Sequence, residues 1–209
     1  MTTLTRRERT GLCDFALDVG PDAPTLCGDW TARDLVIHLL VRERSLLGAP
    51  GIVIPALAGM TRRETDRIGG ADFATLVARL RDPGFTPFTL PGIDQVANTV
   101  EFFVHHEDLR RAQPEWAPRP LRVSDQTVLW RALSVMGRAL VRPAGVPVVI
   151  RRTDTDGSVR LRRGADPVTI SALPSEIVMF LYGRRQYDGV EFTGPAPAIA
   201  ALTSAELGI

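Results

Sequence analysis

The chain has 209 residues, of which 44% are hydrophobic and 23% are charged, and its formal net charge is +1. This length and composition suit one globular domain or two small ones, and a near-neutral charge with interspersed acidic residues argues against nucleic acid as the main partner. All 25 basic residues are arginine and none is lysine, which excludes a Schiff-base lysine and a phosphate loop that ends in Gly-Lys-Ser/Thr.

Membrane association and disulfide bonding are not expected. No apolar run reaches the roughly 18 residues that a membrane span needs, and the first residues lack the apolar segment of a secretory signal. We therefore expect a cytoplasmic protein without a membrane partner. The two cysteines, Cys13 and Cys27, are too few and too far apart for a disulfide framework or a Cys-x-x-Cys metal site. Buried free thiols are the simplest interpretation, and a role in thiol exchange stays open.

Helical periodicity dominates the first two thirds of the chain. The first helix is expected to begin at Thr5, with Glu8 completing a capping box. The second helix is expected from Thr31, which forms a capping pattern with Asp34, to Leu47. A later helix is expected to be capped by Asp72. Other segments with helical spacing of apolar residues are 62–68, 93–112 and 124–142.

After residue 145 the pattern becomes that of strands. Three β-type runs, 146–151, 158–162 and 167–170, look like a meander. A buried helix and a last strand follow at 175–182 and 189–193. We therefore predict an α+β protein, in which a four-helix bundle over residues 1–143 is followed by a small module of sheet plus helix over residues 144–209.

The candidate functional residues lie on two of the expected helices, 93–112 and 31–47. Glu101 and His105 are four residues apart, so they share one helical face, and Asp108 lies on that face too. His38 falls in a strongly apolar helical run, where an unpartnered imidazole is costly. Because helix bundles commonly build metal sites from inward side chains, we predict that His38, Glu101 and His105 bind one divalent metal ion.

Neighbouring polar residues are expected to support these ligands. Asp34, four residues before His38, is a candidate for orienting its imidazole, and Asp108 is a candidate for the same role at His105. His106 is rotated by about 100° from His105, so it should not share the site and is either a supporting or a structural residue. The alternative is that His38 is a core histidine bonded to Asp34 or to a backbone carbonyl.

The chemistry of the site follows from the ligand set. Two imidazoles and one carboxylate leave at least one coordination position open, as in catalytic rather than structural zinc sites. Such a metal can ionise a bound water or thiol, or polarise a carbonyl. Zinc is the first choice, and Fe²⁺ or Ni²⁺ would accept the same ligands.

Three segments of the chain resemble a known family. Residues 30–39 and 101–109 resemble the N-terminal domain of mycothiol-dependent maleylpyruvate isomerases and the wider group of DinB-like metal-binding bundles. Residues 174–185 are similar to the α+β tail of the same group. The chain looks closest to a metal-binding subfamily without an assigned reaction.

The resemblance implies a ligand set and a substrate-binding residue. It implies a zinc ion held by His38, Glu101 and His105, in agreement with their spacing. It also implies that an arginine of the C-terminal module, Arg184 or Arg185, reaches the site to hold an anionic substrate, because arginine binds carboxylates well.

The sequence therefore predicts a zinc-dependent transferase or isomerase that uses a low-molecular-weight thiol of the mycothiol type on a small anionic substrate, as a monomer or homodimer. The first alternative is a non-catalytic protein in which the metal joins two helices or is sensed. The second alternative is a metal-dependent hydrolase. That reaction needs a general base, and Glu107 lies on a different helical face.

Overall fold

The chain divides into two units, Met1–Trp116 and Ala117–Ile209. The computed structural model describes residues 3–44, 58–82, 84 and 95–208. The change in sequence pattern predicted a division after residue 143, whereas helix α7 (Val123–Leu140) packs against α8 (Pro174–Leu181) and β2 (Ser158–Arg162). This helix therefore belongs to the second unit.

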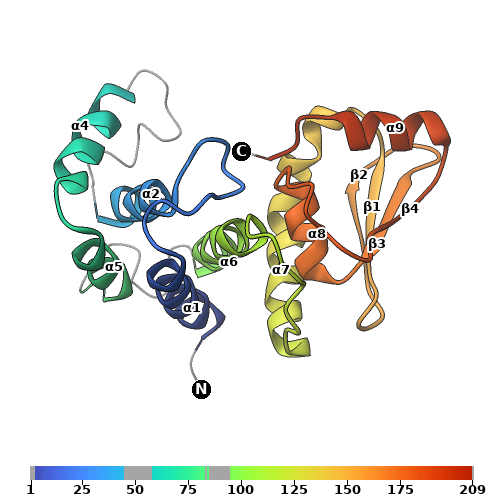
Figure 1. The fold of residues 1–209 in the computed structure, drawn as a ribbon. Helices are drawn as coiled ribbons and strands as arrows, with labels where there is room; N and C mark the ends of the chain where they lie inside the picture. The colour runs from blue at the N-terminus through green and yellow to red at the C-terminus, as the bar shows by residue number, and fades with distance from the viewer. Residues whose placement is uncertain (1–2, 45–57, 83, 85–94, 209) are drawn as a thin grey trace. The chain divides into compact units, whose positions relative to one another are not determined.

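The first unit is helical (Figure 1). Its described helices are α1 (Leu4–Val19), α2 (Ala32–Arg44), α4 (Ala58–Gly69), α5 (Phe73–Arg81) and α6 (Gln95–Arg111). Helix α1 packs against α5 and α6, and α2 packs against α4 and α5. None of the helices in the described parts of the chain is long and apolar enough to cross a membrane.

Capping residues explain where several helices begin. Asp34 accepts a hydrogen bond from the backbone N–H of Thr31 (3.0 Å), and Asp72 accepts one in the first turn of α5 (3.0 Å), as the sequence predicts. The predicted cap at Thr5 is wrong, because Thr3 caps α1 instead. The expected end of the second helix near Leu47 and the expected start of α6 near residue 93 lie outside the described residues.

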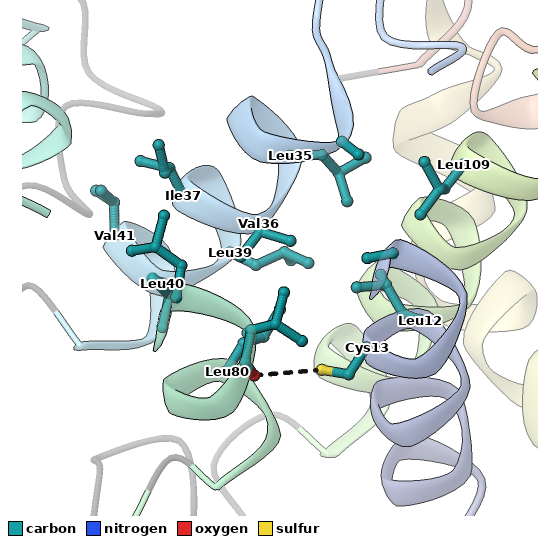
Figure 2. Close-up of a cluster of buried hydrophobic side chains, with 14 of the residues drawn as sticks. Leu12, Cys13, Leu35, Val36, Ile37, Leu39, Leu40, Val41, Leu80 and Leu109 are labelled. Carbon is teal, nitrogen blue, oxygen red and sulfur yellow. Dashed lines mark hydrogen bonds between the residues drawn. The ribbon is translucent and has the colours of Figure 1, made fainter. Parts of the chain in front are cut away.

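An apolar core joins α1, α2 and α5 (Figure 2). Leu12 of α1, Leu39 of α2 and Leu80 of α5 are fully buried and lie in one cluster, to which Leu109 of α6 also belongs. Burying one leucine side chain contributes about 1.5–3 kcal/mol. This core fixes the positions of α2 and α6, the helices that carry the candidate metal ligands.

The second unit contains a four-stranded sheet in the order β2-β1-β3-β4. Its other strands are β1 (Val148–Arg152), β3 (Val168–Ala172) and β4 (Glu191–Thr193), and its helices include α8, α9 (Ala196–Ser204) and the short η3 (Arg142–Ala144). This sheet and the helical first unit confirm the predicted α+β class.

The predicted meander is wrong, because β1 lies in the middle and pairs with β3 in parallel as well as with β2 in antiparallel orientation. The reason is burial. Strands β1 and β3 are mostly buried, whereas β2 carries the exposed Arg160 and Arg162. Charged side chains suit an edge strand, since they discourage further pairing. The arginine-rich strand therefore takes the edge and leaves the two apolar strands side by side.

Candidate metal centre

Helix α6 is buried along most of its length, and its polar side chains are paired. His106 Nδ1 lies 2.8 Å from Glu8 Oε2 of α1, and Arg111 Nε donates a 2.5 Å hydrogen bond to Glu107. Buried polar groups need such partners. His106 thus faces α1 and joins the two helices, so it takes no part in the candidate centre.

The structure brings the three predicted ligands together. Glu101 Oε1 lies 3.4 Å from His38 Nε2 and 3.3 Å from His105 Nε2, and one ligand atom from each residue lies within 4.8 Å of the other two. Ligand atoms about 2.0–2.1 Å from a tetrahedral zinc ion are about 3.3–3.4 Å apart. The two distances from the Glu101 oxygen to the imidazole nitrogens therefore match those between neighbouring ligands of a zinc ion. We call this set the first position.

The charge of Glu101 is stabilised by its neighbours. Arg42 lies one helical turn beyond His38, and its Nε is 3.4 Å from Glu101 Oε1. Burial alone raises the pKa of Glu101, but hydrogen bonds with His105 and His38 and the charge of Arg42 lower it well below its usual range. For His38, burial lowers the pKa, and the hydrogen bond with Glu101 opposes this. The carboxylate stays ionised and the His38 imidazole tends to be neutral, as metal ligation requires.

Asp108 holds the other side of the His105 ring. Its Oδ2 lies 3.0 Å from His105 Nδ1, and the Asp108 side chain is completely buried. Burial alone lowers the pKa of His105, but hydrogen bonds with Asp108, Cys27 and Glu101 raise it well above its usual value. A carboxylate on Nδ1 leaves Nε2 to face Glu101, which is the usual support for a metal-bound histidine.

Cys27 lies beside the predicted ligands, although its position in the sequence does not predict this. Its Sγ donates a hydrogen bond to Asp108 Oδ2 (3.1 Å) and lies 3.7 Å from His105 Nδ1. The contact spans 78 positions along the chain and joins a loop to a helix, so no periodicity predicts it. The only signal was the residue type, a thiol in a chain with two cysteines and three histidines.

Trp30 and Asp34 lie near His38 in different ways. The Trp30 ring centroid is 4.9 Å from that of His38, and the Trp30 side chain is partly exposed. The predicted support of His38 by Asp34 is not found, since Asp34 is exposed and bonds to the backbone and hydroxyl of Thr31. Its place in the first turn makes it a helix cap, which uses up its carboxylate.

The two arginines implied by the family resemblance lie in the second unit. Arg184 Nη1 donates to the backbone oxygen of Tyr182 (2.6 Å), and Arg185 Nη1 donates to that of Thr203 (2.7 Å). Within that unit, both guanidinium groups therefore bind carbonyl groups at the end of α8 and in α9.

Comparison with known proteins supports the fold. No family model and no curated protein matches the chain. Among solved structures, the chain is similar to the crystal structure of the mycothiol-dependent maleylpyruvate isomerase, with a TM-score of 0.59 and 17% sequence identity over 93% of this chain and 92% of that chain. At this identity the similarity shows a shared fold, which supports the α+β architecture predicted from the sequence.

Proposed function

We propose that this protein is a divalent-metal-dependent transferase or isomerase that uses a low-molecular-weight thiol on a small anionic substrate. The observation that supports it most is the approach of His38 Nε2 and His105 Nε2 to Glu101 Oε1, at 3.4 and 3.3 Å. The thiol part of the proposal comes from the fold, which is shared with an isomerase described as mycothiol-dependent.

The donors of the first position fit a borderline metal with an open coordination site. Two imidazoles and one carboxylate suit zinc, and Fe²⁺ or Ni²⁺ would accept the same ligands. The His38 and Glu101 side chains are 16% and 23% exposed, so a small molecule can approach. When bound, zinc would supply a Lewis acid that lowers the pKa of a thiol.

The protein's own residues would prepare this site in three ways. Arg42 adds to the hydrogen bonds from His105 and His38 that keep the Glu101 carboxylate ionised, because its positive charge lies beside that oxygen. Asp108 holds the proton of His105 on Nδ1, which leaves Nε2 as the donor nitrogen. Trp30 packs against the His38 ring and offers a partly exposed apolar surface next to the ligands.

Binding of the anionic substrate is assigned, as part of this proposal, to Arg184 or Arg185. A guanidinium group can bind a carboxylate through two parallel hydrogen bonds. The two residues are adjacent and of the same type, so single Arg184→Gln and Arg185→Gln variants distinguish them. The arginine that binds substrate should raise KM when replaced, whereas the other should leave KM unchanged.

Two alternatives make different demands on the site. A metal ion with a purely structural role, which only joins α2 and α6, is expected to be fully coordinated by protein and shielded from water. The partial exposure of His38 and Glu101 argues against such a structural site. A hydrolase needs a general base near the metal. Glu107 is buried and bound by Arg110 (3.0 Å) and Arg111, so its carboxylate is already occupied by two guanidinium groups.

Metal content tests the first half of the proposal. Purified Cys27→Ser protein, which lacks the thiol beside the site, should contain about one equivalent of zinc or a similar metal in the first position, since three donors suffice for catalytic zinc. Adding His38→Ala to this protein should remove that metal, and so should adding His105→Ala. Equal, near-zero metal in all three proteins would refute the metal-dependent function.

A cobalt titration tests the thiol half. In the Cys27→Ser variant the chain's own thiol near the site is removed, so a thiolate-to-cobalt absorption band can come only from an added thiol. We expect mycothiol to produce this band in cobalt-loaded Cys27→Ser protein and to fail when His38→Ala is added. Metal binding without any band at millimolar thiol would reject thiol chemistry and favour the non-catalytic alternative.

A further inference from the structure

We propose that Cys27, His105 and Asp108 form a second metal position, which takes a thiophilic divalent cation such as Zn²⁺ or Cd²⁺. One sulfur, one nitrogen and one oxygen from these residues lie within 4.8 Å of one another. The nitrogen is Nδ1 of His105, whereas Nε2 of the same ring faces Glu101. One imidazole would therefore serve two metal positions through its opposite edges.

The distances within this set are close to those of a tetrahedral ion. Cys27 Sγ lies 3.1 Å from Asp108 Oδ2 and 3.7 Å from His105 Nδ1, and the last two atoms are 3.0 Å apart. Around tetrahedral zinc, with sulfur at about 2.3 Å and nitrogen or oxygen at about 2.0–2.1 Å, sulfur lies about 3.5–3.6 Å from the other donors, which are about 3.3 Å apart. Small side-chain rotations would therefore suffice.

The loop that carries Cys27 is fixed by hydrogen bonds that do not involve its sulfur. The Cys27 backbone N–H donates to Thr25 Oγ1 (3.1 Å), and the Thr25 hydroxyl donates to the carbonyl of Trp30 (2.8 Å). The neighbouring Leu26 N–H donates to the backbone oxygen of Asp108 (3.1 Å). The loop is thus tied directly to the turn of α6 that supplies the oxygen donor, so ordering the sulfur costs little when a metal binds.

Burial and donor chemistry indicate which cation the set would take. Asp108 is completely buried and His105 is nearly so, whereas Cys27 is half-buried, which leaves the sulfur as the side open to an entering ion. A thiolate favours zinc or cadmium over magnesium or calcium. On binding, the thiol and Nδ1 protons pass to solvent, and bonds from the metal to sulfur, nitrogen and oxygen replace the hydrogen bonds among these groups.

Cobalt spectroscopy without any added thiol tests this proposal. We expect wild-type protein titrated with Co²⁺ to develop a thiolate-to-cobalt band in the near ultraviolet, and Cys27→Ser to lack it. The matched control is Cys13→Ser, because the Cys13 thiol is fully buried and its Sγ contacts the carbonyl of Val77 at 3.8 Å. Cys13→Ser should keep the band. No band in wild-type protein, or a band that survives Cys27→Ser, would overturn the proposal.

A second variant separates this position from the first. His38→Ala removes a donor from the first position only. The thiolate-to-cobalt band should therefore remain in this variant, although the metal ion of the first position is lost. A band that disappears in His38→Ala would mean that Cys27 acts at the first position, and the second position would be rejected. Failure of the thiol enzyme proposal leaves this test unchanged, since no thiol substrate is present in it.

Discussion

Replacing Asp108 by asparagine should weaken zinc binding at the first position by about 10- to 100-fold, the usual effect of losing a carboxylate that supports a metal-bound histidine. The Asp108 carboxylate is completely buried and lies 3.0 Å from His105 Nδ1. Asparagine keeps the shape but removes the negative charge that makes the imidazole a better donor. The expected loss corresponds to about 1.4–2.7 kcal/mol of binding free energy.

The measurement is a zinc competition titration against a chromophoric chelator, carried out in Cys27→Ser protein so that only the first position binds. Asp34→Asn is the matched control, because it makes the same chemical change at an exposed helix cap whose bonds go to Thr31. The amide oxygen of asparagine can still accept the hydrogen bonds from Thr31, so zinc affinity and fold should both be kept.

Two results would refute this reasoning. If Asp108→Asn binds zinc as tightly as its parent, the hydrogen bond to His105 does not contribute to metal affinity. If Asp34→Asn loses as much affinity as Asp108→Asn, the effect is one of overall charge rather than of the bond to Nδ1. Circular dichroism of each variant would establish that α2 and α6 remain folded.

Three further predictions follow from the packing and charges of the first unit. A Cβ atom at Gly11 would lie 2.6 Å from His106 Cε1. Gly11→Ala should therefore destabilise the protein by about 1–2 kcal/mol in urea denaturation, because this overpacking outweighs the better helix propensity of alanine. Iodoacetamide should label Cys27 and spare Cys13 in native, metal-free protein at about pH 8, since burial raises the pKa of Cys13 to about 12; equal labelling of both cysteines would contradict the described burial. Because the pKa of His105 is raised in the folded protein, its protonation stabilises the metal-free fold fully below pH 6.5, the ordinary pKa of histidine, and this contribution is lost as pH rises through the higher folded pKa. The free energies of unfolding in urea of chelator-treated wild-type protein and of His105→Gln should therefore differ most near and below pH 6.5 and converge at high pH.

Helical periodicity was enough to predict that Glu101 and His105 lie side by side, because it fixes which side chains share a face. Glu101 and His105 are one turn apart on α6, and His38 lies in an apolar run of α2 that had to be buried. The same rule correctly rotated His106 away from the site, where it meets Glu8 of α1. Because these residues lie in regular helices, the direction of each side chain around its helix axis follows from its position in the sequence.

Strand order and side-chain partners were harder to predict, since they depend on tertiary packing. The run 158–162 was recognised as a strand, but adjacency in sequence suggested the middle of a meander rather than an edge. Asp34 illustrates a similar limit. Its spacing from His38 allowed contact, yet the same residue also satisfied the cap at Thr31, and the local hydrogen bonds prevailed.

The position of Cys27 beside His105 could not be predicted from the sequence, because it too depends on tertiary packing. The approach of Cys27 to His105 depends on the hydrogen bond from the Leu26 N–H to the backbone oxygen of Asp108 in α6, and such a bond has no periodic signature. Its position has a consequence for mutagenesis, because both ring nitrogens of His105 face possible metal donors. Replacing His105 would remove both proposed positions at once and could not assign an effect to either. His38→Ala removes a donor of the first position only, and Cys27→Ser removes a donor of the second position only. Comparing these two variants can therefore assign activity and thiolate absorption to separate metal ions.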